Sequence, residues 1–167
     1  PEGRRLTALR QTVKTSADDE LTLLIAVGTD TIGDVQVVAA GEPLPPEPNT
    51  IQLENSAGSM RFAELLEQAR IAGKPPTIAG VQDKASASMI SLPVRRQHER
   101  YILKLNPPEY PHLVENENHF LEWSRTAGIS TTAARIIRDS DDVPGLLVTR
   151  FDRIATGGAT QALAVED

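Results

Sequence analysis

The sequence predicts an α+β fold: an antiparallel sheet with a packed helix at residues 49–167, preceded by a small N-terminal α/β subdomain at residues 1–48. Three observations lead to this prediction. Four prolines within residues 41–48 exclude a helix or central strand and indicate a semi-rigid connector. Apolar residues recur at helical spacing over residues 62–71. From residue 77 the pattern becomes loop–strand–strand–helix–strand–strand.

The subdomain begins with a short predicted helix, because three apolar residues recur at helical spacing (Leu6, Leu9 and Val13). The apolar run Leu21–Val27 is too short for length alone to separate helix from strand. The polar residues 16–19 form a good N-cap region and Gly28 a good stop, so we favour a helix. Residues 32–38 alternate and are β-branched, which indicates a strand or a connection from the helix end.

The second domain starts with the helix at 62–71, which Gly73 and Pro75 end. Two strands are predicted next, at 85–92 and 99–105, with residues 93–98 as the hairpin connection. A helix over 112–127, closed by Gly128, precedes strands at 135–138 and 146–151. The intervening turn comprises residues 139–142 with Pro144 and Gly145, and residues 154–163 are predicted to be mobile.

Composition excludes several functional classes. The net charge of −6 does not attract nucleic acid or anionic membranes, and we interpret the local basic cluster of Arg95, Arg96 and Arg100 as a solvated hairpin tip. No cysteine is present, which excludes disulfides and thiolate metal sites and fits a reducing, cytoplasmic location. No apolar run approaches the ~18 residues that span a bilayer. Three scattered histidines give no metal site (His98, His112 and His119).

The strongest chemical signal is one lysine in an apolar strand, followed by one glutamate in an amphipathic helix. Lys104 shares a strand face with Ile102, opposite the face of Leu103. Glu117 lies on a helical stripe with three apolar residues (Leu113, Phe120 and Leu121). An unpaired carboxylate there is costly, so we predict a Lys104–Glu117 pair like the one that orients the phosphate-binding lysine of protein kinases. The alternatives are that each side chain points to water.

We expect two further segments to contribute to the same nucleotide site. Residues 79–84 form a polar loop whose single glycine permits close backbone approach to phosphates, and Lys84 supplies a second cation. An ordinary polar connector is the alternative, because neither common glycine-rich nucleotide motif is matched. The strand at 146–151 is followed by the connector that lines the adenine slot in a kinase-like fold, with Thr149, Arg150 and Phe151 as the contacts. The alternative is a strand end with Phe151 in the core, and the two interpretations are compatible.

Four blocks of sequence occur together in one order. They are Ile32–Gln36, Thr77–Lys84, Tyr101–Lys104 with Val114–Glu117, and Val148–Arg153. As a set they resemble the HipA-type serine/threonine kinases, the toxin halves of bacterial toxin–antitoxin pairs. The resemblance implies that residues 49–167 form a protein-kinase-like small lobe, and that this chain is the N-terminal portion of such a kinase.

The resemblance also implies a function. The expected activity is that of a kinase that uses ATP and Mg²⁺ to phosphorylate a serine on a protein. The known target of the family is glutamyl-tRNA synthetase, and the expected biological role is in bacterial persistence. It implies a helix-turn-helix antitoxin partner, through which alone the protein reaches operator DNA. The implied ATP contacts are Ala79, Gly80, Val81, Gln82, Asp83, Lys84, Lys104, Thr149, Arg150 and Phe151.

Two departures from the family accompany this resemblance. Thr77 stands where the family has an autophosphorylated regulatory serine, and we expect a phosphate there to displace the loop by charge repulsion. The helical lobe that carries the catalytic aspartate and the metal ligands is absent from this sequence, so we expect the fragment alone to be inactive. One alternative is a non-catalytic module that acts as a scaffold or decoy, with residues 1–60 as its main antitoxin-docking surface. Another is an unrelated α+β domain.

Overall fold

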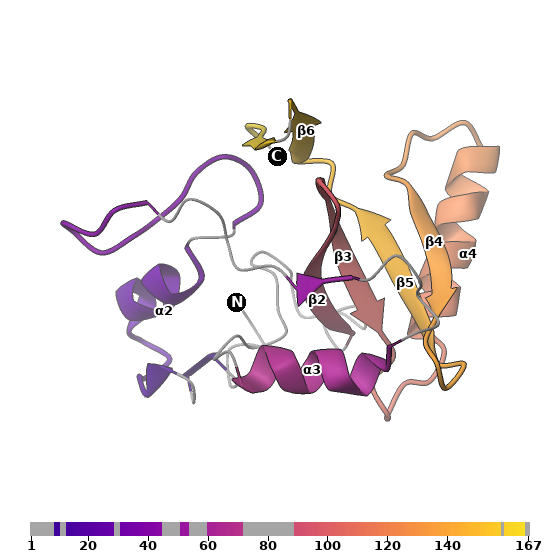
Figure 1. Cartoon of the computed structure of the whole chain (residues 1–167), viewed down its shortest axis with the longest axis horizontal. Coiled ribbons are helices and arrows are strands. Elements are labelled where there is room, and N and C mark those ends of the chain that lie inside the picture. The colour runs from indigo at the N-terminus through magenta and orange to yellow at the C-terminus, as the bar shows by residue number, and fades with distance from the viewer. Residues whose placement is uncertain are drawn as a thin grey trace.

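The computed structural model describes residues 9–10, 13–28, 31–44, 51–53, 60–71, 89–157 and 159–165. The α+β class is confirmed, and the elements with described bounds include a five-stranded sheet and the helices α2 (Glu20–Val27), α3 (Phe62–Ile71) and α4 (Leu113–Thr126), which Figure 1 labels. The strands are β1 (Ile51–Gln52), β2 (Ile90–Arg96), β3 (Glu99–Leu105), β4 (Ala134–Arg138), β5 (Pro144–Thr149), β6 (Arg153–Thr156) and β7 (Ala159–Ala162).

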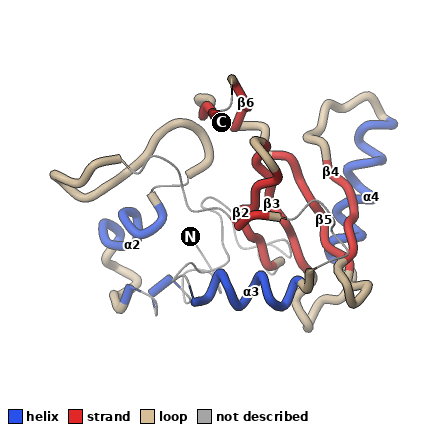
Figure 2. Tube along the Cα trace, in the orientation of Figure 1, coloured by secondary structure: helices blue, strands red, loops and turns tan. Residues whose placement is uncertain are grey.

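The sheet has the strand order β1-β2-β3-β5-β4, and β6 and β7 form a separate antiparallel hairpin. Only β1 and β2 pair in parallel; the other neighbours in the sheet are antiparallel. Figure 2 shows the two long helices beside this sheet and α2 set apart from it. None of the helices in the described ranges is both long and apolar enough to cross a bilayer.

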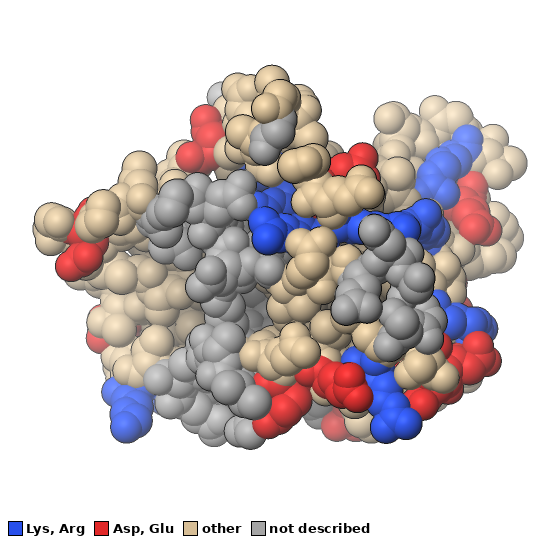
Figure 3. Space-filling model, in the orientation of Figure 1, with Lys and Arg blue, Asp and Glu red and all other residues tan. Residues whose placement is uncertain are grey.

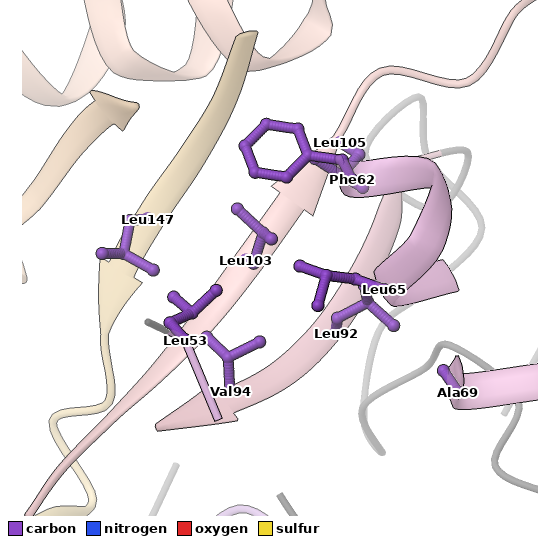
Figure 4. Packing of buried hydrophobic residues seen from close by; sticks show 9 residues of the cluster. All are labelled: Leu53, Phe62, Leu65, Ala69, Leu92, Val94, Leu103, Leu105 and Leu147. Carbon is purple, nitrogen blue, oxygen red and sulfur yellow. The ribbon is translucent and has the colours of Figure 1, made fainter. Parts of the chain in front are cut away.

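One face of the sheet packs against α3 and holds the larger core. Leu103 and Leu105 on β3 point to this face, since side chains two residues apart along a strand share a side. Figure 4 shows how they meet Phe62 and Leu65 from the helix. Further members of the cluster are Leu53, Ala69, Leu92, Val94 and Leu147. Fully burying each leucine contributes roughly 1.5–3 kcal/mol, so this contact is the main reason that α3 lies where it does.

The opposite face packs against α4. Leu146 and Val148 on β5 form its core with Val114 of the helix, and Ile102 on β3 packs against them. Consequently β5 is buried on both faces, which explains its continuous apolar run Leu146–Val148. Strand β3 therefore presents leucines to one helix and Ile102 with Lys104 to the other.

The N-terminal region agrees with the predictions only in part. Residues 9, 10 and 13 are helical, and α2 starts after Asp19, whose carboxylate accepts the Thr22 N–H, and ends at Gly28. The prediction of a strand at 32–38 is wrong, and the alternative of a connection is right. The backbone of residues 32–38 bonds to the carbonyl of Gly28 and to the side chains of Asp152 and Arg153 instead of to a strand. The described part of residues 1–48 thus contains helix but no strand.

The first hairpin is tighter than predicted. Strand β2 continues through Pro93 to Arg96, and only Gln97 and His98 form the turn. Proline removes a ladder donor and normally argues against a strand interior. Pro93 is accommodated because the described residues of β1 pair with Val94 and Arg95, so none of them takes a hydrogen bond from the proline. Residues 85–88 of the predicted first strand lie outside the described ranges.

Two segments predicted as turn or mobile chain belong to strands. Pro144 and Gly145 open β5, where a proline is tolerated as the first residue. A Cβ on Gly145 would lie 2.9 Å from Phe62 and 3.0 Å from Leu103, so only glycine lets α3 approach this strand. The segment predicted to be mobile, 154–163, contains the β6–β7 hairpin.

Asp139, in the turn between β4 and β5, joins that turn to α3. Its carboxylate is buried and accepts the backbone N–H of Phe62 at 2.9 Å, although 77 residues separate the two. It also accepts the N–H groups of Asp141 and Val143, each at 2.9 Å. Asp139 therefore caps the first turn of α3 from a distant segment and shapes its own turn.

We expect Asp139→Ala to lower the free energy of unfolding by about 2 kcal/mol, because three backbone donors lose a buried acceptor. Urea denaturation measures this change. The matched control is Asp141→Ala in the same turn, whose half-exposed carboxylate pairs with Arg61 at 3.2 Å and contributes at most about 1 kcal/mol. Equal losses in both variants would contradict the capping role.

The stability difference between wild type and Asp139→Ala should depend on pH. Burial acts to raise the pKa of Asp139, but hydrogen bonds from the N–H groups of Phe62, Val143 and Asp141, and the Arg61 charge, outweigh it and hold the pKa below 3.8. A lowered pKa stabilises the fold above the unfolded value of the group. The difference should thus be constant above about pH 5 and shrink as pH falls below 3.8. A difference independent of pH down to 2 would contradict this assignment.

Candidate nucleotide-binding site

Lys104 and Glu117 meet between β3 and α4. The ammonium Nζ donates to Glu117 Oε1 at 2.6 Å, a distance typical of a charge-assisted hydrogen bond. The exposed fractions of the two side chains are 23% and 25%. The pair is therefore partly screened by water, and its net contribution to stability is on the order of 1 kcal/mol. The carboxylate thus holds the lysine side chain in place, and part of the lysine surface remains accessible to a ligand.

The helix positions Glu117 through its buried face. Val114, one turn earlier, is fully buried against β5, and Leu121, one turn later, packs against the same cluster. The expectation that Phe120 shares this stripe is wrong: its side chain is 55% exposed and contacts the rings of His119 and Trp123. Glu115, on a different side of the helix, bonds to Asn106 instead of to the lysine.

The end of β5 leads into a buried network of charges. Asp152 lies between two arginines: Arg150 donates to its two oxygens at 2.9 and 2.6 Å, and Arg153 donates to one of them at 2.8 Å. The side chains of Arg150 and Asp152 are 5% and 3% exposed. Burial acts to raise the pKa of Asp152, but the hydrogen bonds from Arg150 and Gly33 and the charges of both arginines lower it below 3.8.

The same network holds the segment after α2. Asp152 accepts the N–H of Gly33 at 3.0 Å, and both arginines donate to the carbonyl of Thr31, at 3.0 and 3.1 Å. Gly33 has φ +89°, a conformation that favours glycine. Two of the sequence blocks singled out above, at 32–36 and 148–153, are thus in contact across 119 residues of chain. Sequence reasoning missed Asp152; its only signal was a carboxylate flanked by two arginines in an apolar context.

The three residues predicted to contact adenine have different surroundings. The N–H groups of Thr149 and Arg150 already donate to the carbonyls of Ala133 and Arg100, at 2.8 and 3.0 Å. The Arg150 side chain is committed to Asp152 and Thr31. Phe151 is 62% exposed, so the alternative that it is buried in the core is wrong. Of the three, Phe151 has the side chain most available to a ligand, and the adenine contact stays a prediction.

The remaining predicted site residues, Ala79–Lys84 and Thr77, lie outside the described ranges, so the ATP contacts of the loop and the phosphorylation of Thr77 also stay predictions. Within the described ranges, no three acidic or histidine side chains gather in a way that holds a metal ion.

Arg100 is buried, unlike the solvated tip predicted for it. Figure 3 shows basic atoms in a band across the middle of one face, with acidic atoms around it.

We expect Asp152→Ala to destabilise the protein by about 3–5 kcal/mol, because it leaves two buried guanidinium groups without their shared carboxylate. Urea denaturation measures the loss, and amide exchange at Gly33 should become faster than elsewhere in the fold. The control is Asp34→Ala, an exposed carboxylate next to Gly33 that should change stability by less than about 0.5 kcal/mol. An Asp152→Ala protein as stable as the control would contradict the role of the network.

Comparison with known proteins identifies the family. The sequence model described as the HipA-like C-terminal domain matches residues 76–167, more than half of the chain. The fold is similar to that of HipA from Shewanella oneidensis MR-1, solved in a complex described as a toxin–antitoxin system of HipA, HipB and operator DNA, with a TM-score of 0.66 and 21% identity. That similarity covers 98% of this chain but 39% of the Shewanella chain, and no curated protein matches the sequence. The chain belongs to the HipA-like family and corresponds to only part of a HipA protein.

Proposed function

We propose that this chain is the ATP-binding part of a HipA-like protein serine/threonine kinase, with residues 49–167 as its kinase-like small lobe. The observation that carries the proposal is the 2.6 Å contact between Lys104 on β3 and Glu117 on α4. A strand lysine oriented by a helix glutamate is the arrangement that holds the α- and β-phosphates in protein kinases. Membership of the HipA-like family supports the same activity.

The pair suits phosphate binding for a chemical reason. An ammonium group has three N–H donors, and Glu117 occupies one of them, which leaves two for phosphate oxygens. The carboxylate keeps the flexible lysine side chain in one orientation, so less conformational entropy is lost when the nucleotide binds. The loop Ala79–Lys84 would approach the same phosphates, and the exposed ring of Phe151 would contact the base.

For the whole protein we propose transfer of the ATP γ-phosphate to a serine of a translation-related protein, with glutamyl-tRNA synthetase as the expected target. Mg²⁺, when bound, would supply positive charge that offsets the negative charge of the phosphates. The described residues form no metal site, so the Mg²⁺ ligands and the catalytic base would lie outside them. Phosphorylation of Thr77 would add negative charge beside the nucleotide loop and oppose ATP binding.

We also propose a HipB-type antitoxin as partner, through which the protein reaches operator DNA. The Shewanella structure joins HipA, HipB and DNA in one complex. In this chain the region of α2 and the connection after it exposes several large apolar side chains, which is typical of a docking surface (Leu21, Leu24, Val35 and Leu44). Antitoxin binding that persists without any nucleotide affinity would instead favour the non-catalytic module.

We expect Lys104→Ala to weaken ATP binding about 100-fold, because two charge-assisted hydrogen bonds to phosphate are lost. Calorimetric titration of the purified protein with ATP and Mg²⁺ measures the dissociation constant. The fold should persist, since Lys104 keeps about a quarter of its side chain exposed and its pair is worth on the order of 1 kcal/mol.

The control for this variant is Arg138→Ala, which removes a positive charge from the half-exposed edge strand β4 of the same sheet. It should leave ATP affinity within about twofold of wild type, because salt and water screen the field of a solvent-exposed charge. An equal loss of ATP affinity in both variants would mean that only the overall charge of the protein matters. Unchanged affinity in Lys104→Ala would exclude Lys104 from the site.

A further inference from the structure

The start of α4 is capped by a residue outside the helix. His112 occupies the N-cap position, but its side chain caps no backbone N–H of the first turn; its Nδ1 lies 3.7 Å from Glu115 Oε1 instead. Asn106, just after β3, takes over this role: its Oδ1 accepts the N–H of Val114 at 2.9 Å. Its Nδ2 donates to Glu115 Oε2 at 3.0 Å. Both polar atoms of one amide are thus used on consecutive residues of the helix.

This amide lies in line with the candidate phosphate-binding lysine. Ile102, Lys104 and Asn106 alternate with the leucines that face α3, so all three point to the α4 face. Each meets the helix in its own way: Ile102 packs in the cluster around Val114, Lys104 bonds Glu117, and Asn106 bonds the first turn. Ile102 and Lys104 on β3, and Asn106 just after it, therefore contact one helix.

We propose that Asn106 is a positioning residue that sets the placement of α4 along β3 so that Glu117 reaches Lys104. A hydrophobic contact such as that of Ile102 is non-directional and allows the helix to slide or rotate. The hydrogen bonds of Asn106 are directional, and they hold Val114 N and Glu115 Oε2 at 2.9 and 3.0 Å from the amide of a residue two positions beyond the lysine. Val114 and Glu117 lie one turn apart, so fixing the first also fixes the second.

The consequence for ATP binding depends on the proposed function, whereas the placement of the helix does not. A residue that only caps α4 would change the stability of the helix and leave the Lys104–Glu117 contact intact. A positioning residue changes the contact itself. The two roles are distinguished by the coupling between Lys104 and Glu117, which a double-mutant cycle measures from stability alone.

The test is a double-mutant cycle of Lys104→Met and Glu117→Gln, measured by urea denaturation with Asn106 present and again with Asn106→Ala. We expect the coupling to be lost with Asn106→Ala. It should be retained when Asn106→Asp is combined with Glu115→Gln, because this pair keeps the oxygen for the Val114 N–H and reverses the direction of the second hydrogen bond. The matched control is Gly128→Ala at the other end of α4, where φ is +79° and an added Cβ meets no atom within 4 Å. It strains the helix end without touching β3, so the coupling should remain.

Coupling that survives in Asn106→Ala, or that is lost equally in Gly128→Ala, would overturn the positioning role. ATP affinity is the second readout: Asn106→Ala should weaken it about tenfold, as expected for one misplaced charge-assisted hydrogen bond, and Gly128→Ala should not. A wild-type protein without ATP affinity would refute the proposed function, and the coupling would still decide the role of Asn106.

Discussion

The alternation of side chains along β3 is the constraint on which both layers of the fold depend. Leu103 and Leu105 enter the core under α3, while Ile102 and Lys104 face α4. A shift of one residue in the pairing of this strand would exchange the two sets, placing a lysine among leucines and removing the partner of Glu117. Packing and the candidate site are thus determined by one register, held by the pairs Leu103–Leu147 and Lys104–Leu146.

Buried charges join parts of the chain that packing alone does not orient. Asp139 connects the β4–β5 turn to the start of α3, and Asp152 connects the end of β5 to Thr31 and Gly33. In each case a carboxylate accepts backbone N–H groups that would otherwise lack a partner, which offsets the cost of its burial. These contacts are directional, so they place the adjoining segments more narrowly than hydrophobic contacts do. The turn that contains Phe151 is accordingly set by Arg150 and Asp152.

The sequence was informative where local physics decides structure. The start of α2 follows from Asp19, whose carboxylate accepts the Thr22 N–H, and the end of α4 follows from Gly128, whose φ of +79° does not continue a helix. The contact between Lys104 and Glu117 was predictable because each charge interrupts an apolar pattern and needs a partner. The nucleotide roles assigned to these residues and to the loop Ala79–Lys84 stay predictions.

Other features depend on contacts between distant segments, which a local pattern does not contain. Strand β2 passes through Pro93 because the described residues of β1 pair with Val94 and Arg95 instead. Gly145 belongs to a strand because it pairs with Leu105 and Ile137, and its lack of a side chain leaves room for Phe62. The segment at 32–38 is no strand, because its backbone is bound by residues more than a hundred positions later. Phe120 was wrongly placed on the buried stripe because helical spacing alone does not determine which side of an amphipathic helix meets the sheet.

Labelling with an acyl-phosphate derivative of ATP tests the central claim most directly, since the reagent acylates lysines that lie beside bound nucleotide phosphates. Mass spectrometry of the labelled protein would compare Lys104, at the candidate site, with Lys14, an exposed lysine beside α2. We predict that Lys104 is acylated and that excess ATP prevents it, while labelling of Lys14 is low and unaffected by ATP. A Lys104 that stays unlabelled, or that is labelled equally with and without ATP, would contradict the assignment of this pair to a nucleotide site.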